Sequence, residues 1–203
     1  MTLYCATQNQ GKLAEFRLAA ERYAPAAGAM VETVPDLARI PAPEETGSTF
    51  HENARLKALY YARFAPGPVF ADDSGLAVDA LDGQPGVHSA RFAGPSATDA
   101  ENNALLIERL RGARDRSARF VCVIALAAGG EIAATFEGSI AGRILDAPRG
   151  SGGFGYDPYF FYPPFGCTLA EATAAQKLSV SHRGQALMHL FRFVAGWTAP
   201  SVP

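Results

Sequence analysis

The sequence predicts an α/β fold with a mixed central β-sheet flanked by helices. In roughly the first half of the chain, short apolar runs alternate with segments of helical periodicity, which is typical of strand–helix units that build parallel sheets. Further along, the strand-like runs 119–128 and 131–140 are separated only by Gly129 and Gly130, a hairpin signal that predicts antiparallel pairing. Both kinds of pairing in one chain predict a mixed sheet.

The N-terminal part is predicted to form two strands and two helices. Residues 2–6 are a strand-like apolar run, and a second strand is expected near 31–34. The first helix should follow the polar segment TQNQGK, because apolar residues recur there at helical spacing, at Leu13, Phe16, Ala20 and Tyr23. Thr49 and Glu52 have the spacing of a capping box, which predicts a second helix from there to about Phe64.

The central part is predicted to continue with a strand, a loop and a helix. Residues 69–71 are short and apolar, as in a buried strand, and 83–94 form a glycine-punctuated loop. Thr98 and Glu101 repeat the capping-box spacing and predict a helix that ends at Leu110.

The C-terminal part is predicted to contain a glycine-rich loop at 148–155, an aromatic strand at 159–162 and two helix starts. Thr168 with Glu171 has the capping-box spacing, and Ser181 is a candidate N-cap for the last helix. The inner face of that helix is expected to consist of Leu187, Leu190, Phe191 and Val194.

Length and composition predict one domain, 1–198, with a disposable tail at 199–203. At 203 residues and 48% hydrophobic, the chain can bury a core without disulfide staples. Cys5, Cys122 and Cys167 are an odd number for a disulfide framework, which favours a reducing compartment. The start, MTLYCATQ, lacks the pattern of a signal segment, and no apolar run approaches the ~18 residues needed to span a bilayer. We therefore expect a cytoplasmic protein without a membrane partner.

The charge balance argues against nucleic acid as a partner. Lys and Arg together number 18 and Asp and Glu 20, so there is no basic excess to hold a polyanionic duplex. A local pocket for a small anion remains compatible with this balance.

The segment TQNQGK lies where an anion site is easily made, because the first amide groups of a helix have no partners within the helix. Gly11 allows close approach of the backbone, and Lys12 can neutralise phosphate. The segment is no P-loop, since the first glycine of that motif is absent and Leu13 stands where a metal-binding hydroxyl belongs. An ordinary strand-to-helix turn with a surface lysine is the alternative.

Two adjacent carboxylates follow the apolar run in PVFADDSG. Side chains alternate along an extended chain, so Asp72 and Asp73 cannot both face one site if the strand continues through them. The carboxyl end of a strand in an α/β sheet is a usual ligand position, and Mg²⁺ is the natural cation for such carboxylates. A polar turn is the alternative, because Asp, Ser and Gly all favour turns.

Further polar groups lie in the loop and helix at 44–57. Glu44 and Glu45 form an acidic pair that is compatible with simple solvation, and Glu52 is compatible with helix capping alone. Asn53 and Lys57 are one turn apart and share a helical face, where a surface polar stripe is the alternative.

Two more segments are candidates for nucleotide contacts. GSGGFGYDP surrounds Phe154 with glycines, so that the ring can stack on a base, although a plain flexible loop is the alternative. His182 and Arg183 place cations in the first turn of a helix, against its macrodipole, and Lys177 lies just upstream. A ligand would explain this concentration of cations.

Five ordered motifs resemble the inosine triphosphate pyrophosphatase family over nearly the whole chain. They are ATQNQGK from Ala6, EETGSTFHENARLKA from Glu44, ADDSGLAVDALDGQPGVHSARFAG from Ala71, GSGGFGYDPYFF from Gly150 and SHRGQAL from Ser181. The resemblance implies an elongated, two-lobed fold with a central cleft and a homodimer. It also implies Mg²⁺-dependent hydrolysis of ITP, dITP and XTP to the monophosphate and pyrophosphate, which keeps these nucleotides out of DNA and RNA.

The resemblance also implies roles for individual residues. Asp73 would be the proton acceptor and, together with Glu44, a ligand of Mg²⁺. The residues expected to bind the substrate are Thr7, Gln8, Asn9, Gln10, Gly11, Lys12, Ser74, Phe154, Gly155, Tyr156, Asp157, Lys177, His182 and Arg183. Glu52, Asn53, Lys57 and Asp72 are expected to support the site.

The sequence departs from the family pattern at several positions. Gln8 stands where the family usually has glycine, and the other departures are His88, Phe92, Gln176 and Leu178. They leave open a pyrophosphatase with relaxed specificity for other modified nucleotides. A nucleotide sensor without catalysis is a further alternative, against which the intact Asp73 and Glu44 argue.

Overall fold

The computed structural model describes residues 1–25 and 30–197, so the predicted tail at 199–203 lies outside the described residues. The strands are β1 (Thr2–Cys5), β2 (Met30–Thr33), β3 (Val69–Val78), β4 (Ser117–Ala128), β5 (Glu131–Ile144), β6 (Phe160–Tyr162) and β7 (Cys167–Thr168). The α-helices are α1 (Gln10–Tyr23), α2 (Phe50–Ala62), α3 (Asp99–Arg109), α4 (Ala174–Val180) and α5 (His182–Ala195). Short 3₁₀ helices are η1 (Leu37–Arg39), η2 (Asp79–Leu81), η3 (Gly86–Arg91) and η4 (Pro163–Phe165). None of the helices in the described part of the chain is long and apolar enough to cross a bilayer.

The strands form one mixed sheet, as the sequence predicts. The order is β2-β1-β3-β4-β5-β6-β7. β1 pairs in parallel with β2 and β3, whereas β6 pairs antiparallel with β5 and β7. Cys5 of β1 lies opposite Phe70 of β3, and the amide of Ala6 donates to the carbonyl of Phe70 over 3.1 Å. This register puts the polar residues that leave β1 beside the aspartates that follow Phe70.

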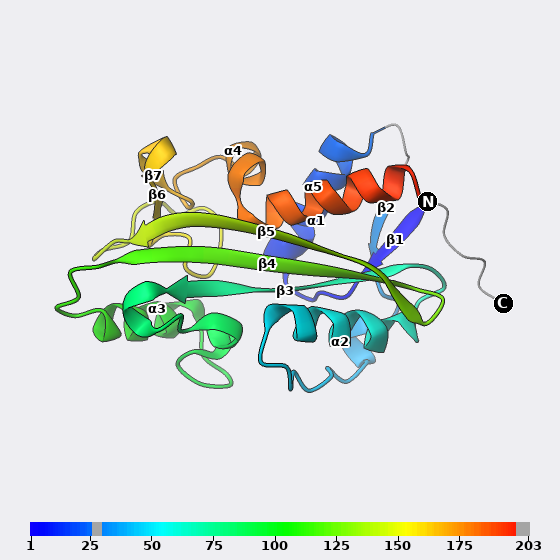
Figure 1. Ribbon diagram of the computed structural model, residues 1–203, viewed down its shortest axis with the longest axis horizontal. Helices are drawn as coiled ribbons and strands as arrows, with labels where there is room; N and C mark the ends of the chain where they lie inside the picture. The colour runs from blue at the N-terminus through cyan, green and yellow to red at the C-terminus, as the bar shows by residue number, and fades with distance from the viewer. Residues whose placement is uncertain (26–29, 198–203) are drawn as a thin grey trace. The chain divides into compact units, whose positions relative to one another are not determined.

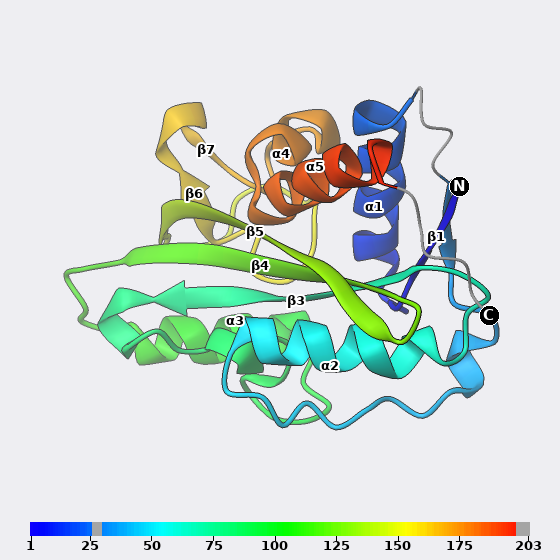
Figure 2. The same ribbon diagram turned by 45° about the vertical axis from the view of Figure 1, so that its right-hand side comes forward.

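The chain divides into two compact units. Among the described residues, unit 1 consists of 1–25, 30–73, 122–138 and 183–197. Within it, α2 covers one face of the strands, and α1 and α5 cover the other (Figures 1 and 2). Ala54 and Ala58 of α2 pack on small side chains of β3 and β4, which lets the helix approach the sheet closely.

On the opposite face of unit 1, large side chains fill the space under the helices. Phe16 of α1 meets Phe70 edge to face, with ring centres 5.0 Å apart. The predicted inner face of α5 is confirmed as buried, at Leu187, Leu190, Phe191 and Val194.

Unit 2 consists of residues 74–121 and 139–182 and has a core of its own. Leu106 and Leu110 of α3 pack in one hydrophobic cluster with side chains of β3, β4 and β5. Phe120 and Phe160 join that cluster, with ring centres 4.6 Å apart. The expected capping box at Thr98 and Glu101 is present at the start of α3.

The strand that carries the two aspartates is longer than predicted. The sequence predicts a strand over 69–71, with a polar turn as the alternative for the residues that follow, but β3 continues to Val78. Asp72 and Asp73 thus lie inside the strand, with only 5% and 6% of their surface exposed. The strand continues because cationic side chains meet both carboxylates, so the acids need no solvent-exposed turn.

The helix predicted from Thr168 is wrong. The reciprocal bonds between Thr168 and Glu171 do form, but Thr168 is paired in β7 opposite Phe161, and only a single turn follows it. A second box, Thr173 with Gln176, starts α4 instead. The predicted hairpin turn is confirmed, because Gly129 and Gly130 both adopt the positive φ that this turn requires.

A glycine inside β3 tests the packing of unit 2. A Cβ atom at Gly75 would collide with the carbonyl oxygen of Gly86 and with the hydroxyl of Ser89. We expect Gly75→Ala to lower the free energy of unfolding by about 2 kcal/mol or more, because backbone must move to make room. Urea denaturation measures this. Gly196→Ala is the control, since among the described residues other than its chain neighbours no atom lies within 4 Å of its Cβ position. An equal loss in both variants would contradict the packing.

Candidate active site

Asp72 is the centre of a buried group of charges in unit 1. Its carboxylate accepts a hydrogen bond from Lys12 Nζ over 3.0 Å and one from Arg183 Nε over 3.2 Å. Burial alone would raise the pKa of Asp72, but the charges of Lys12 and Arg183 outweigh burial and lower it. Asp72 is therefore ionised and holds a side chain of α1 and one of α5 on β3.

The partners of Arg183 explain why this cation can occupy the first turn of α5. Its Nη1 donates to Glu15 Oε2 over 2.8 Å, while its Nε donates to Asp72. Burial disfavours the charged guanidinium, but Glu15 and Asp72 raise the pKa of Arg183 above its ordinary value. The unfavourable helix dipole is thus offset by two carboxylates.

Asp73 has a different set of partners, as alternation along a continuing strand predicts. Lys57 Nζ of α2 donates to Asp73 Oδ1 over 2.6 Å, and the amide of Asn53 lies 3.5 Å from Oδ2. Burial raises the pKa of Asp73 by more than the charge of Lys57 lowers it. Lys57 is half-buried, and desolvation alone would lower its pKa, but the surrounding acids raise it.

Glu45, which the sequence did not indicate as a site residue, also forms an ion pair with Lys57. Lys57 Nζ donates to Glu45 Oε1 over 3.0 Å, whereas Glu44 is exposed. Asn53 holds the loop in place, because its side chain accepts from the amide of Gly47 over 2.9 Å. The two acids stand side by side in a loop without periodicity, so no signal in the sequence distinguishes which of them faces Lys57.

The segment 7–12 forms a shaped turn at the start of α1. Asn9 is the N-cap and accepts from the amide of Lys12 over 3.0 Å, and the hydroxyl of Thr7 accepts from the amide of Asn9. Gln8, which replaces the usual glycine, donates to the carbonyl of Leu37 over 3.2 Å. Gln10 and Gly11 begin the helix itself. The start of α1 thus brings amide groups and Lys12 to the same place as Asp72.

Among the supporting residues, Glu52 has a structural task. It completes the capping box of α2 by accepting from the amides of Ser48 and Thr49. The capping alternative considered for Glu52 is therefore what the structure contains. Ser74 follows Asp73 within β3 and is half-buried.

The predicted nucleotide-binding residues of unit 2 form a compact group of their own. Asp157 Oδ2 accepts from the amide of Phe154 over 2.9 Å and from Lys177 Nζ over 2.5 Å. The Lys177 ammonium lies 4.7 Å from the centre of the Phe154 ring, which is a cation–π contact. Lys177 and Asp157 are buried. The structure therefore brings Phe154, Asp157 and Lys177 together.

Tyr156 and His182 are buried ring side chains of unit 2. The Tyr156 hydroxyl donates to the carbonyl of Ser89 over 2.7 Å, and burial raises the pKa of Tyr156. His182 stacks on Phe120 with ring centres 4.7 Å apart. Both contacts also serve the core of the unit, so their predicted contacts with a nucleotide stay predictions.

The two carboxylates that contact Lys57 are candidate ligands for a metal ion that also binds phosphate. No group of three His, Cys, Asp or Glu residues with metal-site geometry occurs within residues 1–25 and 30–197. Asp73 and Glu45 nevertheless offer two carboxylates to one ammonium group. Mg²⁺ commonly takes one or two protein carboxylates and completes its shell with water and substrate phosphates. This donor set therefore fits Mg²⁺ together with a phosphate ligand.

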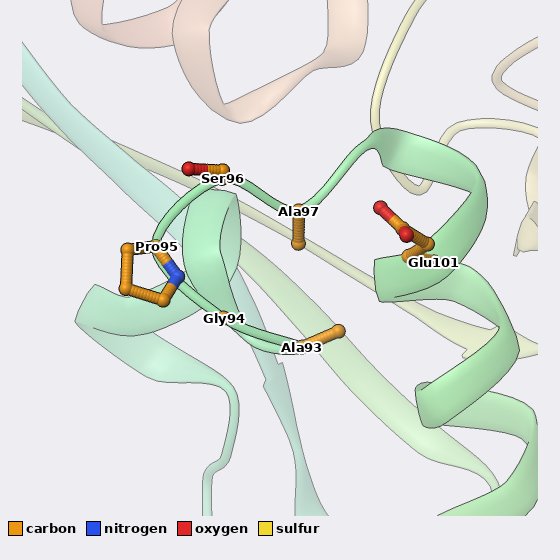
Figure 3. Close-up of a pocket in the computed structure, with 6 residues that line it drawn as sticks. All are labelled: Ala93, Gly94, Pro95, Ser96, Ala97 and Glu101. Atoms are coloured by element: carbon orange, nitrogen blue, oxygen red, sulfur yellow. The ribbon is translucent and has the colours of Figure 1, made fainter.

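A separate pocket in unit 2 carries none of the candidate residues. Figure 3 shows the loop before α3 and the side chain of Glu101, and the lining consists of Ala93, Gly94, Pro95, Ser96, Ala97 and Glu101. The Glu101 carboxylate accepts from the amide and hydroxyl of Thr98 as part of the capping box. We therefore do not assign the chemistry to this pocket.

Comparison with known proteins gives consistent matches over nearly the full length of the chain. The model of the Ham1 family matches residues 3–193. A relative from Acidobacterium capsulatum, named dITP/XTP pyrophosphatase, is 50% identical over 97% of this chain and 99% of the relative. A structure of the Ham1 protein of Staphylococcus aureus has a TM-score of 0.83 at 39% identity, covering 97% of this chain and 99% of that one. A structure of a HAM1 protein from Coxiella burnetii has a TM-score of 0.84 at 40% identity, covering 97% of this chain and 100% of that one.

The buried charge of Asp72 generates a stability prediction. Asp72→Asn leaves Lys12 and Arg183 without their shared carboxylate, so we expect the free energy of unfolding at pH 7 to fall by about 3 kcal/mol. Because the pKa of Asp72 is lower in the folded state than in the unfolded state, its stabilisation is complete above the ordinary carboxyl pKa and is lost as the pH falls below it.

Urea denaturation between pH 3 and pH 7 measures both effects. The difference in the free energy of unfolding between wild type and Asp72→Asn should become smaller as the pH falls toward 3. The control is Asp36→Asn, whose carboxylate is 75% exposed and should matter little. A loss no larger than that of the control, or a difference that does not depend on pH, would contradict the role given to Asp72.

Proposed function

The chain belongs to the Ham1 family, and on that premise we propose that it hydrolyses deaminated purine nucleoside triphosphates. The substrates would be ITP, dITP and XTP, and the products the nucleoside monophosphate and pyrophosphate. The near full-length likeness to relatives named dITP/XTP pyrophosphatase supports this choice. Such hydrolysis would keep deaminated nucleotides out of DNA and RNA.

One observation carries the proposal most directly, namely the environment of Asp73. It is a buried carboxylate whose pKa is raised by burial, and it lies 2.6 Å from Lys57 Nζ. A carboxylate with a raised pKa is a better base near neutral pH than an ordinary one. We assign to Asp73 the orientation and deprotonation of the water that attacks the α-phosphorus.

Lys12 and the start of α1 are the proposed binding place of the triphosphate. The amide groups at a helix N-terminus favour anions, and the Lys12 ammonium adds a full positive charge. Asp72 holds that ammonium in place from β3. In this assignment Asp72 is a supporting group that does not take part in the chemistry.

Mg²⁺ is the proposed cofactor, held by Asp73 and by an acid of the pair Glu44 and Glu45. The contact between Lys57 and Glu45 favours Glu45 over the originally expected Glu44. A bound Mg²⁺ would neutralise phosphate charge and so improve pyrophosphate as a leaving group. Lys57 balances the two acids and keeps them in reach of a shared cation.

Base preference is assigned to Arg183 and His182. A guanidinium carries donors only, so it can donate to the 6-keto oxygen of hypoxanthine or xanthine but not to the 6-amino group of adenine. Glu15 and Asp72 fix the orientation of Arg183, which makes such a mismatch costly. Phe154, Gly155, Tyr156, Asp157, Lys177 and Ser74 stay proposed substrate contacts on the strength of the family resemblance.

Three further expectations remain part of the proposal. The protein would act as a homodimer, in the cytoplasm, and without a nucleic-acid partner. Its three cysteines are free thiols, and burial raises the pKa of Cys5 to about 12, which makes that thiol unreactive. Cysteines without disulfide bonds are typical of proteins from a reducing compartment, which is the support for the expected location.

The proposed activity is tested by pyrophosphate release from ITP and ATP, with and without a chelator. We expect kcat/KM for ITP to exceed that for ATP by at least about 100-fold, because the 6-amino group of adenine would face the hydrogen-bond donors of Arg183 and find no acceptor there. Asp73→Asn should lower kcat for ITP by at least about 100-fold, since the base is lost, while the affinity for ITP largely persists.

The control for this experiment is Asp146→Asn, a carboxylate that is 85% exposed in an ion pair with Arg116. It should hydrolyse ITP at the wild-type rate. Equal use of ATP would contradict the base preference, and activity in the presence of chelator would contradict the metal. Full turnover by Asp73→Asn would contradict its assignment as the base.

A further inference from the structure

Two residues of α3 hold the backbone of Gly155 from both sides. Asp99 Oδ2 accepts a hydrogen bond from the amide of Gly155 over 2.6 Å. Asn103 Nδ2 donates to the carbonyl oxygen of Gly155 over 2.9 Å. Asp99 and Asn103 are one helical turn apart, so both side chains lie on the same face of α3 and reach the backbone of Gly155. Neither residue belongs to the motifs that carry the family resemblance.

The same loop is fixed at its other residues. The amide of Phe154 donates to Asp157, and a Cβ atom at Gly153 would collide with the Asp157 carboxylate. Gly153 and Gly155 both have positive φ, at 70° and 62°, which favours glycine. The glycine-rich segment therefore has a defined backbone conformation with internal hydrogen bonds.

The Asn103 side chain is oriented by its donors. Its amide nitrogen donates to the carbonyls of Gly155 and Asp99, which fixes which end of the amide is nitrogen. Asn103 is 7% exposed, and its Oδ1 has no hydrogen-bond partner among the residues that the structure describes. If the position served packing alone, an apolar residue would suit it better. The asparagine is therefore explained by the hydrogen bond that its side-chain amide donates to Gly155.

We infer that Asp99 and Asn103 are positioning residues that hold the ring of Phe154 in place for the nucleobase. The inference rests on the proposed function, because the contact between Phe154 and the base is itself proposed there. Phe154 directly precedes Gly155, so Asp99 fixes the peptide group that joins the ring residue to Gly155, and Asn103 fixes the next peptide group. The Lys177 ammonium, 4.7 Å from the ring centre, fixes the side chain itself.

This role predicts an effect on substrate binding without an effect on the chemical step. The hydrogen bonds of Lys57 to Asp73 and of Lys12 to Asp72 lie within unit 1, whereas α3 belongs to unit 2. A loosened Phe154 would lose contact with the substrate and with the transition state alike, which raises KM and leaves kcat unchanged.

The test compares variants of two acids in the first turn of α3. Asp99→Ala removes the acceptor of the Gly155 amide, so we expect KM for ITP to rise about tenfold with kcat within about twofold. Asp99→Asn keeps an acceptor oxygen and should bring KM back to within about threefold of wild type. Glu101→Ala is the matched control, because Glu101 accepts from Thr98 and makes no contact with Gly155 within the described chain.

Hydrogen exchange at Gly155 gives a readout that does not need activity. The amide should exchange at least about tenfold faster in Asp99→Ala than in wild type and Glu101→Ala, because its hydrogen bond is gone. Equal KM for Asp99→Ala and Glu101→Ala, or unchanged exchange at Gly155, would overturn the inference. If the wild type does not hydrolyse ITP, the proposed function fails, and the exchange measurement still decides whether Asp99 holds the loop.

Discussion

The structure depends on two adjacent carboxylates buried in the middle of a strand. An uncompensated carboxylate cannot remain ionised in such a place, so Asp72 and Asp73 each require cations of their own. Asp72 is met by Lys12 and Arg183, and Asp73 by Lys57. These ion pairs hold α1 and α5 on one face of β3 and α2 on the other.

The alternation of the strand separates the tasks of the two acids. Neighbouring residues face opposite sides, so carboxylates that follow each other in sequence experience different fields. Two full cationic charges lower the pKa of Asp72 and keep it ionised at neutral pH, whereas burial prevails at Asp73 and raises its pKa. A single strand thereby supplies one group that organises cations and one suited to proton transfer.

Most of the fold could be predicted from the sequence, because periodicity, capping boxes and the Gly129–Gly130 turn are local signals. The length of β3 could not, since its continuation depends on cations that arrive from distant helices. Thr168 shows the same limit, because strand pairing of that residue overrode its capping-box spacing. At the site, the roles of Glu45 and of Asp99 as acceptor for the Gly155 amide were missed, because Glu45 and Gly155 lie in loops, whose residues carry no period that reveals their direction.

The most direct test of this account is an NMR titration of the side-chain carboxyl carbons, with Asp72 and Asp73 assigned through their Asn variants. The ordinary pKa of an aspartate is about 4. The account predicts that Asp72 titrates below this value and Asp73 above it, because cations dominate at the first and burial at the second. Titration of both carboxyls together near the ordinary value, or in the reverse order, would contradict the separation of tasks.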